Sequence, residues 1–266
     1  MIENSKRFKL VLGLHALLGG YMSYGVAIKV KEGLVFASDS RTNAGLDNVN
    51  TYSKMFTYNV GDRAFVILTA GNLATSQAVY HQLEKDINSD NPEINLNLCE
   101  DIEAAAQYIG RLSVSSSNQS LEVQNQSSLM GSFFILGGQI KDQEPNLLLI
   151  YPEGNFIYVS NEQPYLQIGE TKYGKPILDR MINKDTPIGD SARVALLSLD
   201  STMRSDLTVG PPIDFVVYKK DQMHLDYQGR YKLKSPYFKE MSDTWAQKLS
   251  DAIHTLPKFE WEEENK

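Results

Sequence analysis

The chain contains few residues of the types that cross-link a fold or hold a metal ion. Its 266 residues include one cysteine, Cys99, so an internal disulfide framework is excluded. We expect Cys99 to be a small buried residue rather than a reactive thiol. The four histidines show no metal-ligand spacing, and the sequence predicts neither a metal site nor a cofactor. These histidines are His15, His81, His224 and His254.

Positive charge is also scarce. The 26 lysines and arginines are outnumbered by 33 aspartates and glutamates, and the formal net charge is −7. No stretch of the sequence forms a basic patch, which argues against nucleic acid and against an anionic membrane as partners. The apolar run at 10–18 is too short for a mature membrane-spanning helix. The hydrophobic content of 42% is still ordinary, and the length fits one large domain or two small ones.

Two widespread functional motifs are missing or incomplete. The chain has no G-x-S-x-G sequence, which disfavours an α/β-hydrolase. Residues 169–175 have the glycine spacing of a phosphate-binding loop, but the next residue is Pro176, so the hydroxyl that would bind Mg²⁺ is absent. We therefore do not expect nucleotide binding at this loop.

Hydrophobic periodicity predicts strands and helices in separate blocks. Strands are expected at 24–31, 33–38, 51–58, 64–70, 129–140, 147–151, 156–160, 165–168, 213–218 and 223–226. Helices are expected at 73–87, 98–112, 174–181, 188–203 and 237–253. The Ser/Asn/Gln-rich residues 113–128 indicate a helix end and a loop, and the acidic residues 260–266 an irregular end. Blocks of this kind favour antiparallel sheets with helices outside them, an α+β fold.

The chemistry of the chain centres on Ser23, which directly follows Met22. If Met22 is removed, Ser23 carries a hydroxyl and a free α-amine on the same residue. An α-amine titrates at about pH 8 and can accept the hydroxyl proton near neutral pH. Ser23 is therefore a candidate nucleophile with its own base, provided that the mature chain begins there.

Three more candidates lie in or directly after the next predicted strands. Asp39 lies in the turn Ser38-Asp39-Ser40-Arg41-Thr42-Asn43-Ala44-Gly45, Lys54 in the third strand, and Gly71 after the fourth. These blocks resemble the proteasome β-subunit family of N-terminal nucleophile hydrolases, and within it the bacterial Anbu (ancestral β-subunit) branch. Residues 168–176 and 200–205 also look like that branch, and the resemblance spans roughly residues 23–227.

The resemblance implies a role for each candidate. Ser23 would attack a carbonyl carbon, and the positive charge of Lys54 would lower the proton affinity of the Ser23 hydroxyl. Asp39 would pair with Lys54 and hold its ammonium group. Gly71 would offer its backbone N–H to the developing oxyanion. Alone, Lys54 would be taken for a solvated lysine and Asp39 for a turn residue, but both stand at the family's spacing from Ser23.

The groups that would hold the terminal amine depart from the family pattern. Glu170 stands where the family has a serine, and Val209 where a second serine is usual. Asp206 and Thr208 are the candidates that remain for supporting the amine. Ser205 is another residue that could take the place of the missing serine. This departure puts the tuning of the base in doubt, and with it the rate.

The resemblance also divides the chain. Residues 1–22 form an upstream extension, 23–235 a peptidase domain with a four-layer αββα sandwich, and 236–266 a C-terminal helix and acidic tail. The extension is open to three interpretations: a translated stretch before a true start at Met22, a propeptide, or an export signal. We favour the first, because chains of this family usually begin at the methionine before the nucleophile.

The sequence thus predicts a cytoplasmic peptidase that hydrolyses peptides or unfolded proteins and assembles into a homo-oligomeric ring or helical ring. An unfoldase partner stays open. One alternative is an amidase acting on a small amide, and another is a catalytically silent ring or scaffold subunit. The tail helix either covers its own subunit or docks on a neighbour, through an apolar stripe of Phe238, Met241, Trp245, Leu249 and Ile253.

Overall fold

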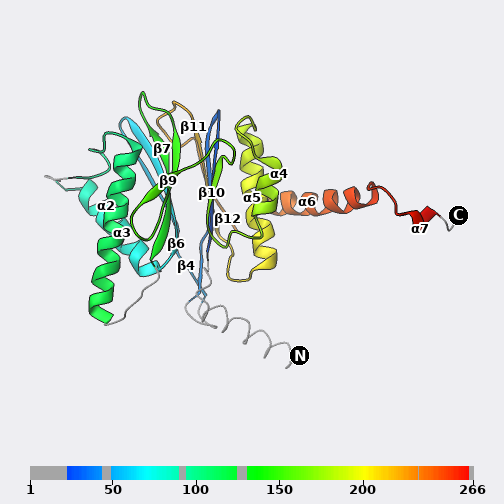
Figure 1. The fold of residues 1–266 in the computed structure, drawn as a ribbon, viewed down its shortest axis with the longest axis horizontal. Coiled ribbons are helices and arrows are strands. Elements are labelled where there is room, and N and C mark those ends of the chain that lie inside the picture. Colours follow the sequence, from blue (N-terminus) through cyan, green and yellow to red (C-terminus); the bar gives the residue numbers. More distant parts are fainter. Residues whose placement is uncertain (1–22, 44–48, 90–93, 125–130, 233, 264–266) are drawn as a thin grey trace.

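The structure, a computed structural model, describes residues 23–43, 49–89, 94–124, 131–232 and 234–263. The expected upstream extension, residues 1–22, lies outside the described residues. Two five-stranded antiparallel sheets lie side by side, with helices on both outer faces (Figure 1).

The first sheet carries the start of the described chain. Its strand order is β10-β1-β2-β11-β12, and every neighbouring pair is antiparallel. The strands are β1 (Tyr24–Val30), β2 (Gly33–Asp39), β10 (Tyr165–Gly169), β11 (Ile213–Lys219) and β12 (Tyr227–Tyr231).

The second sheet has the order β5-β6-β7-β8-β9 and is also antiparallel throughout. Its strands are β5 (Met55–Val60), β6 (Arg63–Gly71), β7 (Ser132–Ile140), β8 (Asn146–Ile150) and β9 (Phe156–Tyr158). A small separate ribbon, β3 (Arg41–Asn43) with β4 (Val49–Thr51), follows β2.

Helices cover the outer face of each sheet. On the side of the second sheet lie α2 (Leu73–Ile87) and α3 (Ile102–Gln124), and on the side of the first sheet lie α4 (Lys175–Met181) and α5 (Ile188–Ser205) (Figure 1). The last helices, α6 (Pro236–His254) and α7 (Glu260–Glu263), extend away from the sandwich beyond α5.

Alternating side chains of the central strands fill three successive apolar cores. In β2, Val35 and Ala37 face the core shared with α4 and α5, while Leu34 and Phe36 face the second sheet. A third core lies between the second sheet and the helices α2 and α3. The three cores separate four layers, and the expected α+β fold, a four-layer αββα sandwich, is confirmed.

Several expected boundaries were wrong. The strand expected at 51–58 is interrupted between β4 and β5, and the strand expected at 223–226 is a turn that precedes β12. Asp221 and Met223 have positive φ angles in that turn, which sheet geometry does not allow. Helix α3 continues to Gln124, through serines that were expected to end it, because serine is a weaker helix former than alanine but does not break a helix as proline does. Residues 260–263 form α7 rather than an irregular end.

The structure also bears on the cysteine and on the helices' relation to a membrane. Cys99 is buried, as predicted, and burial raises the pKa of its thiol to about 11, so the reactive thiolate is disfavoured. None of the helices formed by the described residues has the length and apolar character required to cross a membrane.

The apolar stripe of α6 is divided between two environments. Phe238 is buried against the core next to α5, with Met241 packed against the same core, and Ser242 donates a hydrogen bond to Asp200 of α5 at 2.8 Å. Further along, the exposed fraction reaches 49% for Leu249 and 66% for Ile253. The first turns of α6 therefore cover their own subunit, and the later turns leave apolar side chains in solvent.

Candidate active site

The four predicted catalytic residues come together at one end of the sandwich. Ser23 directly precedes β1, and Asp39 is the last residue of β2, the antiparallel neighbour of β1. Lys54 directly precedes β5, and Gly71 is the last residue of β6, the antiparallel neighbour of β5. Because the start of one strand lies beside the end of its antiparallel neighbour, each sheet contributes two of the four residues to this end.

The predicted contact between Lys54 and Asp39 is present and deeply buried. Lys54 Nζ lies 2.8 Å from Asp39 Oδ1, and the exposed fractions of the two side chains are 5% and 0%. Lys54 Nζ also donates to the carbonyl oxygen of Arg41 at 2.5 Å. A charged pair this far from solvent needs several such partners, because unpaired buried charges are strongly unfavourable.

Asp39 connects this pair to the residue beside Ser23. Its Oδ1 accepts a hydrogen bond from the backbone N–H of Tyr24 at 3.0 Å, in addition to the one from Lys54. Its Oδ2 accepts one from the backbone N–H of Gly210 at 3.2 Å. A single carboxylate oxygen thus joins Lys54 to the peptide that follows Ser23, and the lysine is held next to the candidate nucleophile.

Burial has the largest effect on the pKa values of both residues of the pair. It lowers the pKa of Lys54, while the neighbouring carboxylate of Asp39 opposes the shift. Burial likewise raises the pKa of Asp39, while Lys54 and the two backbone N–H groups oppose that shift. The lysine therefore releases its proton more readily than a solvated lysine does.

Ser23 itself is buried, with 7% of its surface exposed. Its carbonyl oxygen accepts a hydrogen bond from the backbone N–H of Glu170 at 2.8 Å. Gly169 has a φ of +83°, and a Cβ at this position would lie 2.0 Å from the Ser23 carbonyl oxygen. The backbone of the turn after β10 therefore holds Ser23, and only a glycine at 169 allows so close an approach. The Glu170 carboxylate accepts from the N–H of Lys172 at 3.1 Å.

Gly71 is placed by a tight junction between β6 and α2. Its φ is +121°, and a Cβ would lie 2.6 Å from the carbonyl oxygen of Gly131, so a side chain is excluded. The next residue, Asn72, caps α2 by accepting hydrogen bonds from the N–H groups of Ala74 at 2.9 Å and Thr75 at 3.2 Å. Beneath this junction, buried hydroxyl groups are linked by hydrogen bonds: those of Thr69, Ser76 and Ser132.

Asp206 and Thr208, the candidates for supporting the amine, contact each other. Asp206 Oδ1 accepts from both the N–H and the hydroxyl of Thr208, at 2.8 and 2.7 Å. Within the described residues no hydrogen bond links either of them to Ser23. Their loop still reaches the site, because Gly210 bonds Asp39 and Arg41 donates to the carbonyl of Leu207 at 2.6 Å.

Sequence reasoning missed a second carboxylate behind the pair. Asp214 Oδ2 accepts from the hydroxyls of Ser40 and Ser53, each at 2.9 Å, and its Oδ1 pairs with Arg230 at 2.6 Å. Ser40 directly follows Asp39, and Ser53 directly precedes Lys54, so Asp214 holds both segments. A signal was available in the sequence, because an acid in the otherwise apolar run Ile213–Val217 is unusual for a buried strand.

The part of the chain that the structure describes contains no cluster of three His, Cys, Asp or Glu side chains arranged to hold a metal ion. The polar groups at this end are a hydroxyl, an ammonium, carboxylates and backbone N–H groups. This set can support nucleophilic attack on a carbonyl with stabilisation of the oxyanion.

The two antiparallel sheets between helical layers, with a serine at the start of the first strand, have the fold of the N-terminal nucleophile hydrolases. The model of the family "Proteasome subunit" matches residues 23–218, and the chain belongs to this family. Proteasome subunit beta 2 of Pyrobaculum calidifontis is 28% identical over 199 residues, which cover 74% of this chain and 88% of that protein.

Solved structures of Anbu proteins resemble the whole described fold. Anbu (ancestral beta-subunit) from Yersinia bercovieri is 38% identical with a TM-score of 0.83, covering 89% of this chain and 98% of that one. The helical assembly of the Anbu complex from Pseudomonas aeruginosa gives 40% identity and a TM-score of 0.84, with the same shares covered. The structural relatives of this chain are thus Anbu proteins, as the sequence blocks predicted.

Proposed function

We propose that this chain is a peptidase that uses Ser23 as an N-terminal nucleophile. The observation that carries the proposal is the shared oxygen, Asp39 Oδ1, which binds both Lys54 Nζ and the N–H of the residue after Ser23. A buried lysine held beside a strand-initial serine has little structural purpose, since an apolar pair of similar volume would be at least as stable. The same placement lowers the proton affinity of a nearby hydroxyl.

The reaction requires removal of residues 1–22 so that Ser23 has a free α-amine. The amine then takes the proton of the hydroxyl as Oγ attacks the peptide carbonyl, and the N–H of Gly71 stabilises the oxyanion. The C–N bond breaks, the leaving amine takes the proton, and an ester to Ser23 remains. Water hydrolyses this ester, with the amine again accepting a proton. We place this activity in the cytoplasm, on peptides or unfolded proteins.

A covalent probe tests the proposal directly. A peptide epoxyketone should label the protein purified from its native host, because this reagent reacts with both the hydroxyl and the α-amine of one residue. The adduct should lie on an N-terminal Ser23, and Ser23→Ala should abolish labelling without changing the melting temperature. Labelling that persists in Ser23→Ala would remove Ser23 from the reaction.

One observation favours a second candidate, a catalytically silent subunit. The carboxylate of Asp206 is bound to Thr208, and the serines that usually support the amine are replaced by Glu170 and Val209. A chain that begins at Ser23 but resists the epoxyketone would establish this alternative. An amidase acting on a small amide would instead be labelled and would release ammonia from the amide but leave peptides intact.

We further propose that the chain assembles with copies of itself through the outer half of α6. The exposed apolar side chains on α6 and beyond continue the stripe past the part that covers α5, and they include Leu249, Ile253, Leu256, Phe259 and Trp261. One of the structural relatives is described as a helical assembly. The double variant Leu249→Gln/Ile253→Gln should lower the mass measured by light scattering without lowering the melting temperature. A wild-type mass equal to one chain would refute assembly.

A further inference from the structure

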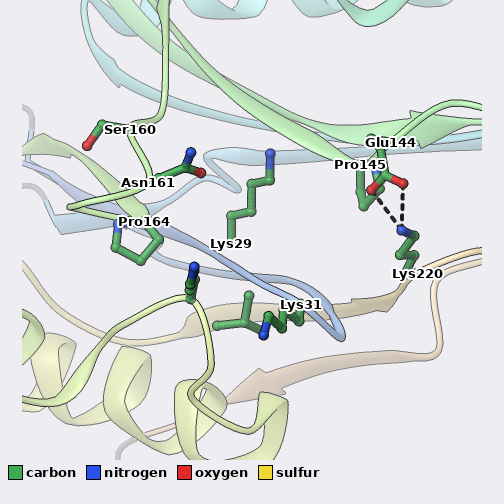
Figure 2. Close-up of a pocket in the computed structure, with 10 residues that line it drawn as sticks. Lys29, Lys31, Glu144, Pro145, Ser160, Asn161, Pro164 and Lys220 are labelled. Atoms are coloured by element: carbon green, nitrogen blue, oxygen red, sulfur yellow. Dashed lines mark hydrogen bonds and ion pairs between the residues drawn. The ribbon is translucent and has the colours of Figure 1, made fainter.

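A cavity of about 220 Å³ opens at the opposite end of β1 from Ser23 (Figure 2). It lies where β1 ends and approaches the turn between β7 and β8 and the segments that flank β10 and α5. Its lining contains four lysines from three separate segments of the chain. The fold brings them together, so they did not show as a basic patch in the sequence. They are Lys29, Lys31, Lys184 and Lys220.

Two of these lysines have a carboxylate partner among the described residues. Lys220 Nζ lies 2.7 Å from Glu144 Oε1, and Lys31 pairs with Asp185. Within the described residues no carboxylate comes within ion-pair distance of Lys29 or Lys184. The local balance is thus positive in a chain whose net charge is −7.

The side chain of Lys29 is the most constrained of the four. Figure 2 shows it rising from β1 between Asn161 and the Glu144–Lys220 pair. Its Nζ donates to the amide oxygen of Asn146 at 2.9 Å, which leaves further donor positions on the ammonium unused by this contact. Half burial lowers the pKa of Lys29, Glu144 opposes the shift, and Lys220 adds to it.

The polar groups of the cavity are mainly donors. Ser160 Oγ already accepts from the N–H of Gln163 at 3.0 Å, so its hydroxyl proton can be donated elsewhere. Asn161 adds an amide, and Glu144, the one carboxylate among the described lining residues, is occupied by Lys220. A cavity rich in donors is complementary to a ligand that carries acceptors and negative charge.

The volume limits the size of that ligand. At roughly 30 Å³ per water, the cavity has room for about seven waters, and it is smaller than the roughly 300 Å³ typical of sites for drug-sized molecules. Lysines bind phosphate as point charges without the fixed fork of arginine. We propose that this cavity is a binding site for a phosphate group, either inorganic phosphate or a small phosphomonoester.

The site is remote from the candidate nucleophile, so the proposal does not depend on peptidase activity. Titration calorimetry of the full chain with sodium phosphate, at constant ionic strength, should show saturable binding with one site per chain. A parallel titration with glycerol phosphate distinguishes the two sources of the group, since tighter binding of the ester indicates a phosphomonoester. No saturable heat with either probe would overturn the proposal.

Two lysine variants locate the site. Lys29→Gln should weaken phosphate binding about tenfold, the effect of losing one charge-assisted hydrogen bond. Lys184→Gln should weaken it in the same direction and replaces Lys29→Gln if that variant fails to fold. Lys248→Gln on exposed α6 removes the same charge and should leave the affinity unchanged. An equal loss in Lys248→Gln would show that the binding follows net charge alone.

Acetylation of lysines gives an independent test on the wild-type chain. At ten times its Kd, phosphate should slow acetylation of Lys29 and Lys184 about tenfold, because about one molecule in eleven has a free site. Lys248 should react at the same rate with and without phosphate. Protection spread evenly over surface lysines would instead mean adventitious ion binding, and the proposal would fail.

Discussion

A lysine lies at each end of β1, and the two are held in opposite ways. At the Ser23 end, Lys54 is almost completely enclosed, and its ammonium contacts the carboxylate of Asp39 and a backbone carbonyl. At the other end, Lys29 is half-buried, and within the described residues its ammonium donates to a neutral amide, that of Asn146. Burial lowers the pKa of both lysines, so the cost of desolvation is common to them.

The difference lies in what completes each site. Lys54 has its counter-charge within the chain, so the ammonium is fixed before any ligand arrives, which suits a group that acts on a neighbouring nucleophile. Lys29 has no carboxylate within ion-pair distance among the described residues, and it lines a cavity, which suits a group that receives an anion from outside. On the two proposals made above, a lysine would serve a preorganised site where the fold supplies the carboxylate and a receptive site where it does not.

The largest expected effect comes from removing the enclosed lysine. Lys54→Met should slow epoxyketone labelling by about 10²–10⁴-fold. It should also cost about 3 kcal/mol of stability, because Asp39 is left buried without its partner. Labelling is followed by mass spectrometry and stability by urea denaturation.

The accompanying control separates chemistry from folding. Lys54→Met/Asp39→Asn removes both charges, so it should recover most of the stability but none of the labelling. The single variant Lys54→Met should be least destabilised at acidic pH. The raised pKa of Asp39 means that the folded state binds more protons, and stability falls as pH rises. Full labelling in Lys54→Met would exclude its assigned role.

Asp39→Asn should have a smaller effect that appears in the pH profile. Labelling requires the ammonium form of Lys54, so the rate falls as pH rises through the pKa of this lysine. Burial already lowers that pKa, and Asp39 is the group that opposes the shift. Its neutralisation should move the alkaline limb of labelling to lower pH. Asp190→Asn, which removes an exposed carboxylate paired with Arg193, should leave the limb in place.

We expect Asp214 to support the reaction by positioning Asp39 and Lys54 rather than through its negative charge. Asp214→Ala leaves the hydroxyls of Ser40 and Ser53 without their acceptor and should slow labelling about tenfold through misplacement of Asp39 and Lys54. Asp214→Asn keeps an acceptor oxygen and should restore most of the rate. If both variants were equally slow, the charge opposite Arg230 would be the cause instead.

The smallest effect is expected at the far end of β1. Lys29→Met should leave epoxyketone labelling unchanged within twofold, because no step of the proposed reaction uses this end of the strand. Its stability should change by about 1 kcal/mol or less, the range for replacing one partly exposed hydrogen-bonded side chain. A large loss of labelling would mean that the two ends of β1 are coupled.

The sequence predicted the layers better than it predicted the contacts. The alternation in β1 and the apolar runs in β2 and β6 predicted strands, and the blocked order of strands and helices predicted the α+β class. The four-layer arrangement was predicted from the family resemblance. The turn at Asp221 depends on positive φ angles, which hydrophobic periodicity does not report. Periodicity also did not show the interruption of the strand at residues 52–54.

At the site, the pairing of Lys54 with Asp39 was predicted because both residues stand at the family's spacing from Ser23. The contribution of Asp214 was not, because it arises from the pairing of β11 with β2, two strands distant in sequence. The lysine cavity was missed for the same reason. Its charges are separated along the chain and are brought together only by tertiary structure.

The central claim is that Ser23 acts as an N-terminal nucleophile beside Lys54, and intact mass of the protein after reaction with a peptide epoxyketone tests it most directly. The account predicts a single species from the native host, a chain beginning at Ser23 plus one inhibitor. A labelled, active species that retains residues 1–22 would contradict it, because the nitrogen of Ser23 would then be in a peptide bond and could not accept the proton.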